Sequence, residues 1–141
     1  MNQEFKDCLE QQKIIKDANA KRLVPREIEA AEKDLAVAQK SFREGQFKWT
    51  TIQSYYSSFH AARALLFSQG YRERSHYCLI QAIEALFVDT GKVDVRLLRF
   101  LINAKVLREK ADYELEFSKD GAEKALEIAK TFLEKVKSLL L

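Results

Sequence analysis

The sequence predicts an all-α fold, a compact up-and-down bundle of about five main helices. Apolar residues recur every three or four positions along most of the 141 residues, which is the spacing of one helix face. The chain has only four glycines and one proline, too few for the many turns of an all-β protein. The connections between the periodic segments are short and favour antiparallel neighbours, so we expect a single domain over residues 1–141.

Residues 1–24 are expected to form an N-terminal helix, over about residues 3–18, and a basic connector with Lys21 and Arg22. Pro25 suits the first turn of the second helix, because proline lacks the N–H that is unpaired there anyway. Gly45 supplies the stop of that helix. The apolar positions between them step by three and four: Ile28, Ala31, Leu35, Ala38 and Phe42.

Three further helices and a long final one follow. The third helix spans about residues 49–69 and ends at Gly70. Ser75 is the expected N-cap of the fourth helix and Asp94 that of the fifth, which runs to about residue 113. Asp120 and Glu123 have the spacing of a capping box, which predicts the start of the last helix there.

The two cysteines, Cys8 and Cys78, form no CxxC unit and have no metal-ligand spacing. We expect two reduced thiols facing the core, in a cytoplasmic protein. The N-terminus is polar and lacks the apolar core of a signal peptide, and no apolar run reaches the roughly 18 residues that span a bilayer. We therefore expect no membrane partner.

Common catalytic motifs are missing from the sequence. It contains no phosphate-binding glycine loop, no H-E-x-x-H and no G-x-S-x-G, and its carboxylates are scattered. We expect no metal and no cofactor. The net charge of +3 permits an anionic partner without requiring one.

The segment Ser54–Leu66 mixes tyrosine, histidine and arginine into an apolar helix pattern. Tyr56, His60, Arg63 and Phe67 share one helix stripe beside the main apolar face. One hypothesis is a phosphate or nucleotide site with a forked arginine donor and a titratable histidine. The alternative is structural: His60 hydrogen-bonds a neighbouring helix, and Arg63 pairs with a carboxylate to fix the register of the bundle.

A second polar cluster precedes the fourth helix. Arg72, Arg74 and His76 lie near its predicted N-terminus, where free N–H groups and the helix dipole attract anions. His76 should resist protonation there and is, with His60, a candidate catalytic base. In the basic fifth helix, Arg108 can pair with Asp112 at i,i+4 or contact a phosphate. For both basic segments the alternative is a merely solvated surface.

Three ordered motifs resemble the prokaryotic HEPN family, whose name stands for higher eukaryotes and prokaryotes nucleotide-binding. They are Ser54–Leu66, then Gly70-Tyr71-Arg72 with Ser75-His76, then Arg108–Tyr113, and the resemblance extends from about residue 26 to residue 140. It implies a bundle of about five helices, often a homodimer, and frequent pairing with a small nucleotidyltransferase. Many members of the wider superfamily are metal-independent endoribonuclease toxins.

Active members of that superfamily carry R-x(4–6)-H, in which the histidine is the base, the arginine stabilises phosphate and two protomers complete the site. This sequence departs from the motif: three residues separate Arg72 from His76, one separates Arg74 from His76, and twelve separate Arg63 from His76. The first hypothesis is therefore a nucleotide- or RNA-binding module that works with a nucleotidyltransferase partner in a toxin–antitoxin-like pair. A dimeric, metal-independent endoribonuclease and a non-catalytic interaction protein are the alternatives.

The predicted nucleotide- or phosphate-binding residues come from three different segments. They are Tyr56, His60, Arg63, Arg72, Arg74, His76 and Arg108.

Overall fold

The computed structural model describes residues 2–141 and confirms the all-α fold class. Two short strands and two short helical turns, Ala20–Leu23 (3-10) and Glu84–Val88 (π-type), accompany the α-helices. The helices are α1 (Gln3–Glu10), α2 (Val24–Arg43), α3 (Phe47–Ser68), α4 (His76–Ile83), α5 (Val95–Tyr113) and α6 (Lys119–Leu140), and the strands are β1 (Ile14–Lys16) and β2 (Tyr71–Glu73).

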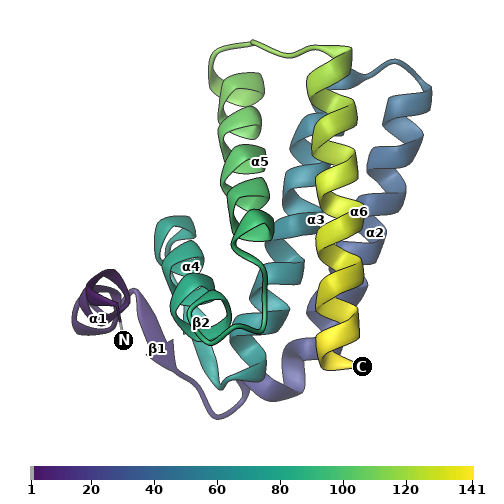
Figure 1. Ribbon diagram of the computed structural model, residues 1–141. Coiled ribbons are helices and arrows are strands. Elements are labelled where there is room, and N and C mark those ends of the chain that lie inside the picture. The colour runs from purple at the N-terminus through teal and green to yellow at the C-terminus, as the bar shows by residue number, and fades with distance from the viewer. Residues whose placement is uncertain (1) are drawn as a thin grey trace.

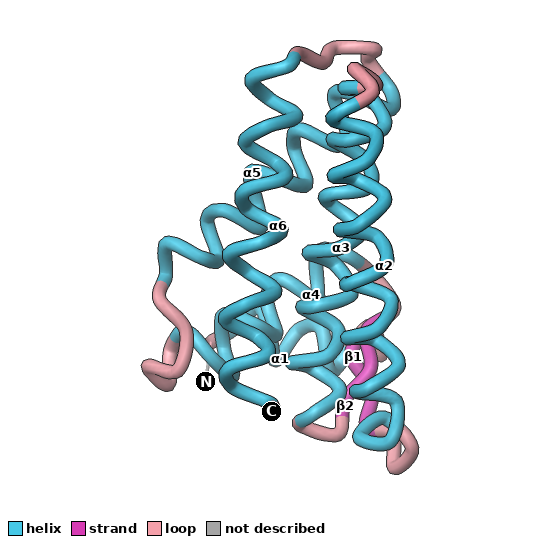
Figure 2. The backbone as a smooth tube through the Cα atoms, turned by 90° about the vertical axis from the view of Figure 1, so that its right-hand side faces the viewer, coloured by secondary structure: helices cyan, strands magenta, loops and turns pink. Residues whose placement is uncertain are grey.

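The four long helices α2, α3, α5 and α6 lie side by side and form the body of the bundle (Figure 1). The smaller elements α1, β1, β2 and α4 gather at one end, beside α3 (Figure 1). Figure 2 shows the paired strands at the same end of the molecule as α1, and β2 contacts α3. The predicted up-and-down bundle is thus the main body. Helix α1 and strand β1, here called the N-terminal attachment, cover part of its side.

Helix α3 is the central helix of the bundle and packs against α2, α5 and α6. Its buried residues lie on all sides of the helix, and many are Ser or Ala, whose small side chains let neighbouring helices approach closely. Ser57 illustrates this packing, because its hydroxyl donates across the interface to the carbonyl of Ala31 in α2 at 2.8 Å. The position of α3 explains why its few large polar side chains meet partners from several elements.

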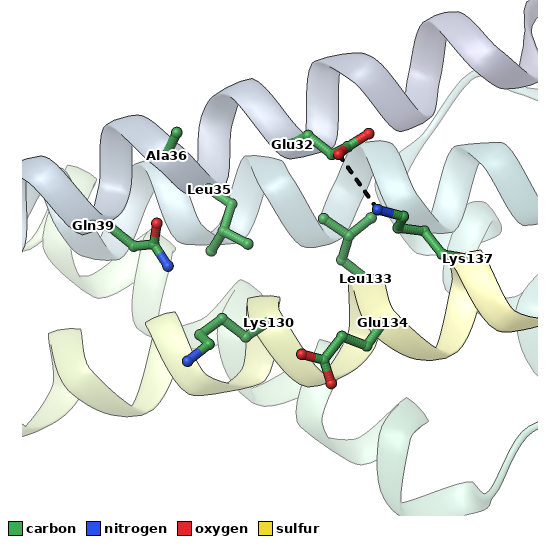
Figure 3. A pocket seen from close by; sticks show the side chains of 8 residues that line it. All are labelled: Glu32, Leu35, Ala36, Gln39, Lys130, Leu133, Glu134 and Lys137. Atoms are coloured by element: carbon green, nitrogen blue, oxygen red, sulfur yellow. Dashed lines mark hydrogen bonds and ion pairs between the residues drawn. The ribbon is translucent and has the colours of Figure 1, made fainter.

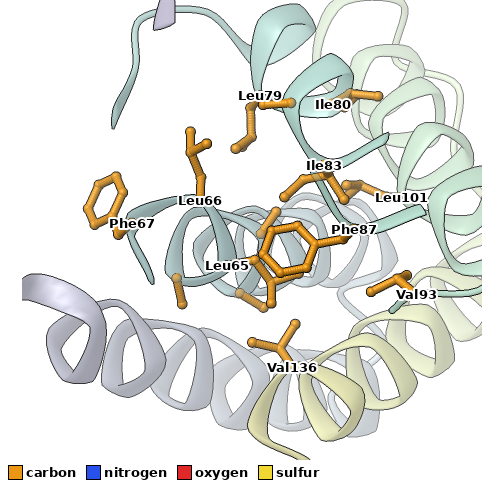
Figure 4. Packing of buried hydrophobic residues seen from close by; sticks show 14 of the residues in the cluster. Leu65, Leu66, Phe67, Leu79, Ile80, Ile83, Phe87, Val93, Leu101 and Val136 are labelled. Carbon is orange, nitrogen blue, oxygen red and sulfur yellow. The ribbon is translucent and has the colours of Figure 1, made fainter. Parts of the chain in front are cut away.

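The main apolar core lies between α3, α4, α5 and α6. Figure 4 shows residues of all four helices meeting around Phe87 and Leu65. Burial of such side chains is the main favourable contribution to folding, at about 25 cal/mol per Å² of apolar surface. No helix within residues 2–141 is long and apolar enough to cross a membrane.

Two of the predicted helix caps are confirmed and one is wrong. The Ser75 hydroxyl accepts the N–H of Cys78 at 3.0 Å, and Asp94 accepts that of Arg96 at 2.8 Å. At α6 the N-cap is Ser118, which accepts the N–H of Gly121 at 3.0 Å, and not the predicted capping box. Ser118 has an extended backbone, so the helix begins directly after it and Asp120 falls inside the first turn.

The predicted N-terminal helix over residues 3–18 is too long. Helix α1 ends at Glu10, and Gln12 adopts a left-handed φ of 58° that turns the chain back. The following residues form β1, which pairs antiparallel with β2 so that Ile15 lies opposite Arg72. Ile14 is buried, so its place in a strand is fixed by tertiary packing as well as by its β-branched side chain.

The predicted pair of reduced thiols is also wrong. Cys8 in α1 and Cys78 in α4 form a disulfide, and each residue is only 2% exposed. The two residues are 70 positions apart in the sequence, and neither lies in a motif, so their proximity is a product of the fold. The disulfide ties the N-terminal attachment to the helix that begins with His76.

Candidate functional site

The structure divides the predicted site residues into two clusters. The first, here called the ion-pair cluster, contains His60, Arg63 and Arg72 with acidic partners. The second, here called the aromatic cluster, contains Tyr56, His76 and Arg108 with further aromatic rings. Arg74 belongs to neither, because its side chain is exposed and its backbone N–H donates to Lys13.

Arg63 is the centre of the ion-pair cluster. Its Nη1 lies 2.6 Å from Oε1 of Glu27 in α2, and its Nε donates to Oε1 of Glu73 in β2 at 3.1 Å. Oε1 of Glu27 accepts no well-aligned hydrogen bond, so the contact with Nη1 is an ion pair. Both carboxylates are largely buried, and the arginine is therefore the shared partner of two charges that water does not reach well.

His60 extends this cluster along α2. Its Nδ1 lies 3.3 Å from Oε2 of Glu27, and its Nε2 lies 3.7 Å from Oδ2 of Asp34. Burial raises the pKa of Glu27, but the hydrogen bond from His60 and the charge of Arg63 outweigh it and lower the pKa overall. Burial raises the pKa of Asp34, against the charge of His60. His60 thus bonds a neighbouring helix, as the structural alternative predicted.

Arg72 adds a weaker pair at the edge of the cluster. Its Nη1 lies 3.5 Å from Oδ2 of Asp17, and its guanidinium lies over the ring of Phe67, which also carries Arg63. Beside them is a polar pocket of about 140 Å³, lined by Leu23, Arg26, Glu27, Arg63, Phe67 and Arg72. The cluster has four acids (Glu27, Glu73, Asp34 and Asp17) against two arginines and one histidine, so it has little attraction for an added anion.

The aromatic cluster is assembled around His76, the first residue of α4. Nδ1 of His76 is hydrogen-bonded to the hydroxyl of Tyr55 in α3 at 2.7 Å. The imidazole stacks on Phe59, with ring centroids 4.3 Å apart. Burial, and then the charges of Arg108 and Lys105, lower the pKa of His76. These causes keep the imidazole neutral near pH 7.

Arg108 is the most unusual charged residue of the cluster, because it is only 7% exposed. Its guanidinium carbon lies 5.1 to 5.8 Å from the ring centroids of Tyr55, Tyr56 and Tyr113, distances typical of cation–π contacts. Nη1 donates to the Tyr113 hydroxyl at 3.4 Å and lies 3.7 Å from Oδ2 of Asp112. Nε is buried and has no hydrogen-bond partner within residues 2–141.

The predicted site residues did not include Tyr55 and Phe59, which lie beside His76 in the structure. Tyr55 is fully buried, yet its hydroxyl bonds a histidine from another helix. The i,i+4 spacing of Tyr55 and Phe59 places both on one side of α3, which was the available signal. Arg108 contacts Tyr55 from α5, and no local sequence pattern predicts that contact.

A separate pocket of about 240 Å³ lies at the seam of α2 and α6 (Figure 3). An ion pair between Lys137 and Glu32, at 3.4 Å, crosses it, and both partners are substantially exposed. The lining combines two lysines and two glutamates with short apolar side chains. Such exposed, mixed charge is typical of a solvated helix seam and adds little stability.

Comparisons with known proteins agree with this architecture. A family model described as "HEPN domain" matches residues 24–139. A Methanocaldococcus jannaschii protein named "Putative toxin MJ0142" is 29% identical over 129 residues, which cover 90% of this chain and 88% of that protein. A second protein of that organism, "Putative toxin MJ0605", is 29% identical over 114 residues, 80% of this chain and 85% of its own length. A "UPF0332 protein" of Archaeoglobus fulgidus is 35% identical over 113 residues, 79% of this chain and 90% of its own.

The matched family model begins at the start of α2 and ends within α6, so it covers all four long helices, the aromatic cluster and the ion-pair cluster apart from Asp17. The N-terminal attachment of α1 and β1 lies outside the match. Since the HEPN family model matches most of the chain, this protein belongs to the HEPN family.

Proposed function

We propose that this protein is a toxin-like member of the HEPN family that binds the phosphate of a nucleotide or of RNA at the aromatic cluster. The observation that carries the proposal is Arg108, a buried guanidinium whose Nε has no hydrogen-bond partner in the described chain. A buried charge without full compensation is costly, and a phosphate bound beside the guanidinium would add the negative charge that Asp112, at 3.7 Å, supplies only in part. The neighbouring Tyr56 and Tyr113, which are not buried, add ring faces on which a base can stack.

Two relatives from M. jannaschii carry the word toxin in their names, and their matches cover 80% or more of this chain. We extend that role to this protein as part of the proposal. By the same family resemblance, we propose that it acts as a homodimer and pairs with a small nucleotidyltransferase that neutralises it. Co-purification with a nucleotidyltransferase encoded beside it would support this pairing, and two separate, non-interacting proteins would contradict it.

A dimeric, metal-independent endoribonuclease is the second candidate. It is favoured by one observation: His76, whose pKa is lowered by burial and by neighbouring cations, contacts the same tyrosine as Arg108. A neutral histidine can accept a proton, and an adjacent guanidinium can stabilise a phosphate in the transition state. RNA that stays intact with the dimer, in the absence of any partner, would exclude this candidate.

Binding by wild-type protein and two arginine variants tests the first proposal. AMP, ATP and a labelled single-stranded RNA would be titrated against wild type, Arg108→Met and Arg99→Met. Arg99 is the matched control because it lies on the same helix with its side chain exposed. We expect Arg108→Met to weaken binding about tenfold or more, as the loss of a charge-assisted hydrogen bond does, and Arg99→Met to have a much smaller effect.

Equal affinities in all three proteins would remove Arg108 from the site. If no nucleotide or RNA binds wild type at all, the non-catalytic interaction protein becomes the better description.

A further inference from the structure

The Tyr55 hydroxyl links α3 to the aromatic cluster: it is hydrogen-bonded to Nδ1 of His76 at 2.7 Å, and Arg108 is its second polar neighbour. Burial raises the pKa of Tyr55 well above that of an ordinary phenol, so the hydroxyl keeps its proton. A buried hydroxyl needs an acceptor for that proton. Arg108 cannot accept it, because a guanidinium only donates hydrogen bonds. The acceptor is therefore Nδ1 of His76.

The direction of this hydrogen bond fixes the protons of the imidazole. If the Tyr55 hydroxyl donates to Nδ1, that nitrogen must carry its lone pair, and the one proton of the neutral ring lies on Nε2. The opposite arrangement, with a proton on Nδ1, would leave the Tyr55 proton buried without an acceptor. That loss is unfavourable because an unsatisfied buried donor keeps its full desolvation cost.

The charges around His76 oppose a second proton on the ring. Arg108 and Lys105 approach from α5, and Arg63 lies farther along α3. Glu109 acts in the other direction, and it pairs with Lys105 at 3.2 Å. Positive charge therefore dominates, and the neutral ring with its proton on Nε2 is the favoured form.

We infer that Tyr55 is a positioning residue that holds His76 in the Nε2–H tautomer, so that His76 donates a hydrogen bond to a phosphate oxygen. The ligand in this inference rests on the proposed function, whereas the tautomer does not. A general base at Nε2 would need its lone pair there, and Tyr55 works against that state. The inference therefore favours phosphate binding over ribonuclease action by His76.

Nitrogen-15 NMR of the histidine rings tests the tautomer directly. The chain has only two histidines, so His60 serves as an internal reference in the same spectrum. Between pH 6.5 and 8, we expect Nδ1 of His76 in wild type to have the chemical shift of an unprotonated nitrogen that accepts a hydrogen bond. A protonated Nδ1, or a doubly protonated ring, over this range would overturn the inference.

Tyr55→Phe and Tyr56→Phe form a matched pair of variants for the same experiment. Tyr56 is a neighbour in α3 whose hydroxyl has no hydrogen bond to His76 among the described residues. Loss of the Tyr55 hydroxyl should move the Nδ1 resonance toward that of a nitrogen without a partner and weaken RNA binding about twofold to tenfold. Tyr56→Phe should leave the Nδ1 resonance in place, and an unchanged resonance in Tyr55→Phe would contradict the inference.

Titration of wild type with AMP or single-stranded RNA separates the two proposals. A shift of the Nε2 proton on addition of either probe supports both. If the Nε2–H tautomer is present but neither probe affects it, the proposed function fails and the role of Tyr55 stands. If the probes bind while Nδ1 is protonated, the proposed function stands and the role of Tyr55 fails.

Discussion

Arg63 and Arg108 are two buried or half-buried arginines with opposite surroundings. Both guanidinium groups lie over aromatic rings at about the same distances. Arg63 contacts two largely buried carboxylates at 2.6 and 3.1 Å. Arg108, although more buried, has one ion pair in the described chain, at 3.7 Å with the half-exposed Asp112.

The two clusters therefore differ in how the charge of their arginine is compensated. In the ion-pair cluster the acids come from α2 and β2, so each contact fixes the position of one element against α3. Such a network is self-contained, because its charges already have partners. In the aromatic cluster, aromatic rings surround the guanidinium of Arg108 and fix its position, but they do not neutralise its charge. This incomplete compensation of the Arg108 charge is the basis of the proposed anion site.

The largest expected effect is on stability, in Arg63→Met. The change removes the common partner of Glu27 and Glu73 and leaves two poorly hydrated carboxylates, which should cost about 3–5 kcal/mol of the free energy of unfolding. Arg108→Met, which removes a charge with little compensation, should stay within about 1 kcal/mol of wild type. Urea unfolding of both variants measures this difference. Equal losses of unfolding free energy in Arg63→Met and Arg108→Met would contradict the difference between the two clusters.

The disulfide should have the next largest effect, and it belongs to the side of the molecule that carries His76. Cys8→Ser should lower the free energy of unfolding by about 2–4 kcal/mol, because the bond closes a long loop in the unfolded chain. Mild reduction of wild type should give the same loss. If unfolding of wild type is identical with and without reductant, the cysteines do not form the bond in solution.

A smaller effect is expected in the acid dependence of stability. The pKa of Glu27 is lowered in the folded state despite its burial, so folding favours the ionised form. Its contribution is present above the ordinary carboxyl pKa, near 4.5, and is lost as the pH falls through the lower folded value. Glu27→Gln should therefore flatten the loss of stability below about pH 5.

The exposed Glu116 provides the control for that measurement, because Glu116→Gln should keep the wild-type acid dependence. An identical acid dependence in Glu27→Gln and wild type would show that the ion-pair cluster does not depend on this carboxylate.

The sequence predicted the bundle well because helix starts and apolar stripes are local features. Pro25, Ser75 and Asp94 lie at helix starts as their residue types require. The strand pair was missed because β1 has only three residues and depends on β2, far along the chain. The disulfide was missed for the same reason, since nothing near Cys8 indicates Cys78.

The site was predicted only in part, for a related physical reason. Local spacing placed His60 and Arg63 on one stripe of α3, and the structure keeps them together. It could not show that Glu73 would reach Arg63 from β2, or that His76 would join Tyr55 and Arg108 instead. Helix packing decides that His76, and not His60, lies near the incompletely paired Arg108, and no short sequence motif predicts that packing.

The two histidines give the most direct test of the central claim, because each belongs to one cluster. The affinity for a labelled single-stranded RNA would be measured for His60→Ala and His76→Ala, after circular dichroism has shown that both variants are folded. We predict that His76→Ala weakens binding about tenfold or more, through loss of a donor to a charged phosphate, while His60→Ala binds like wild type. Loss of binding in His60→Ala with His76→Ala unaffected would contradict the account.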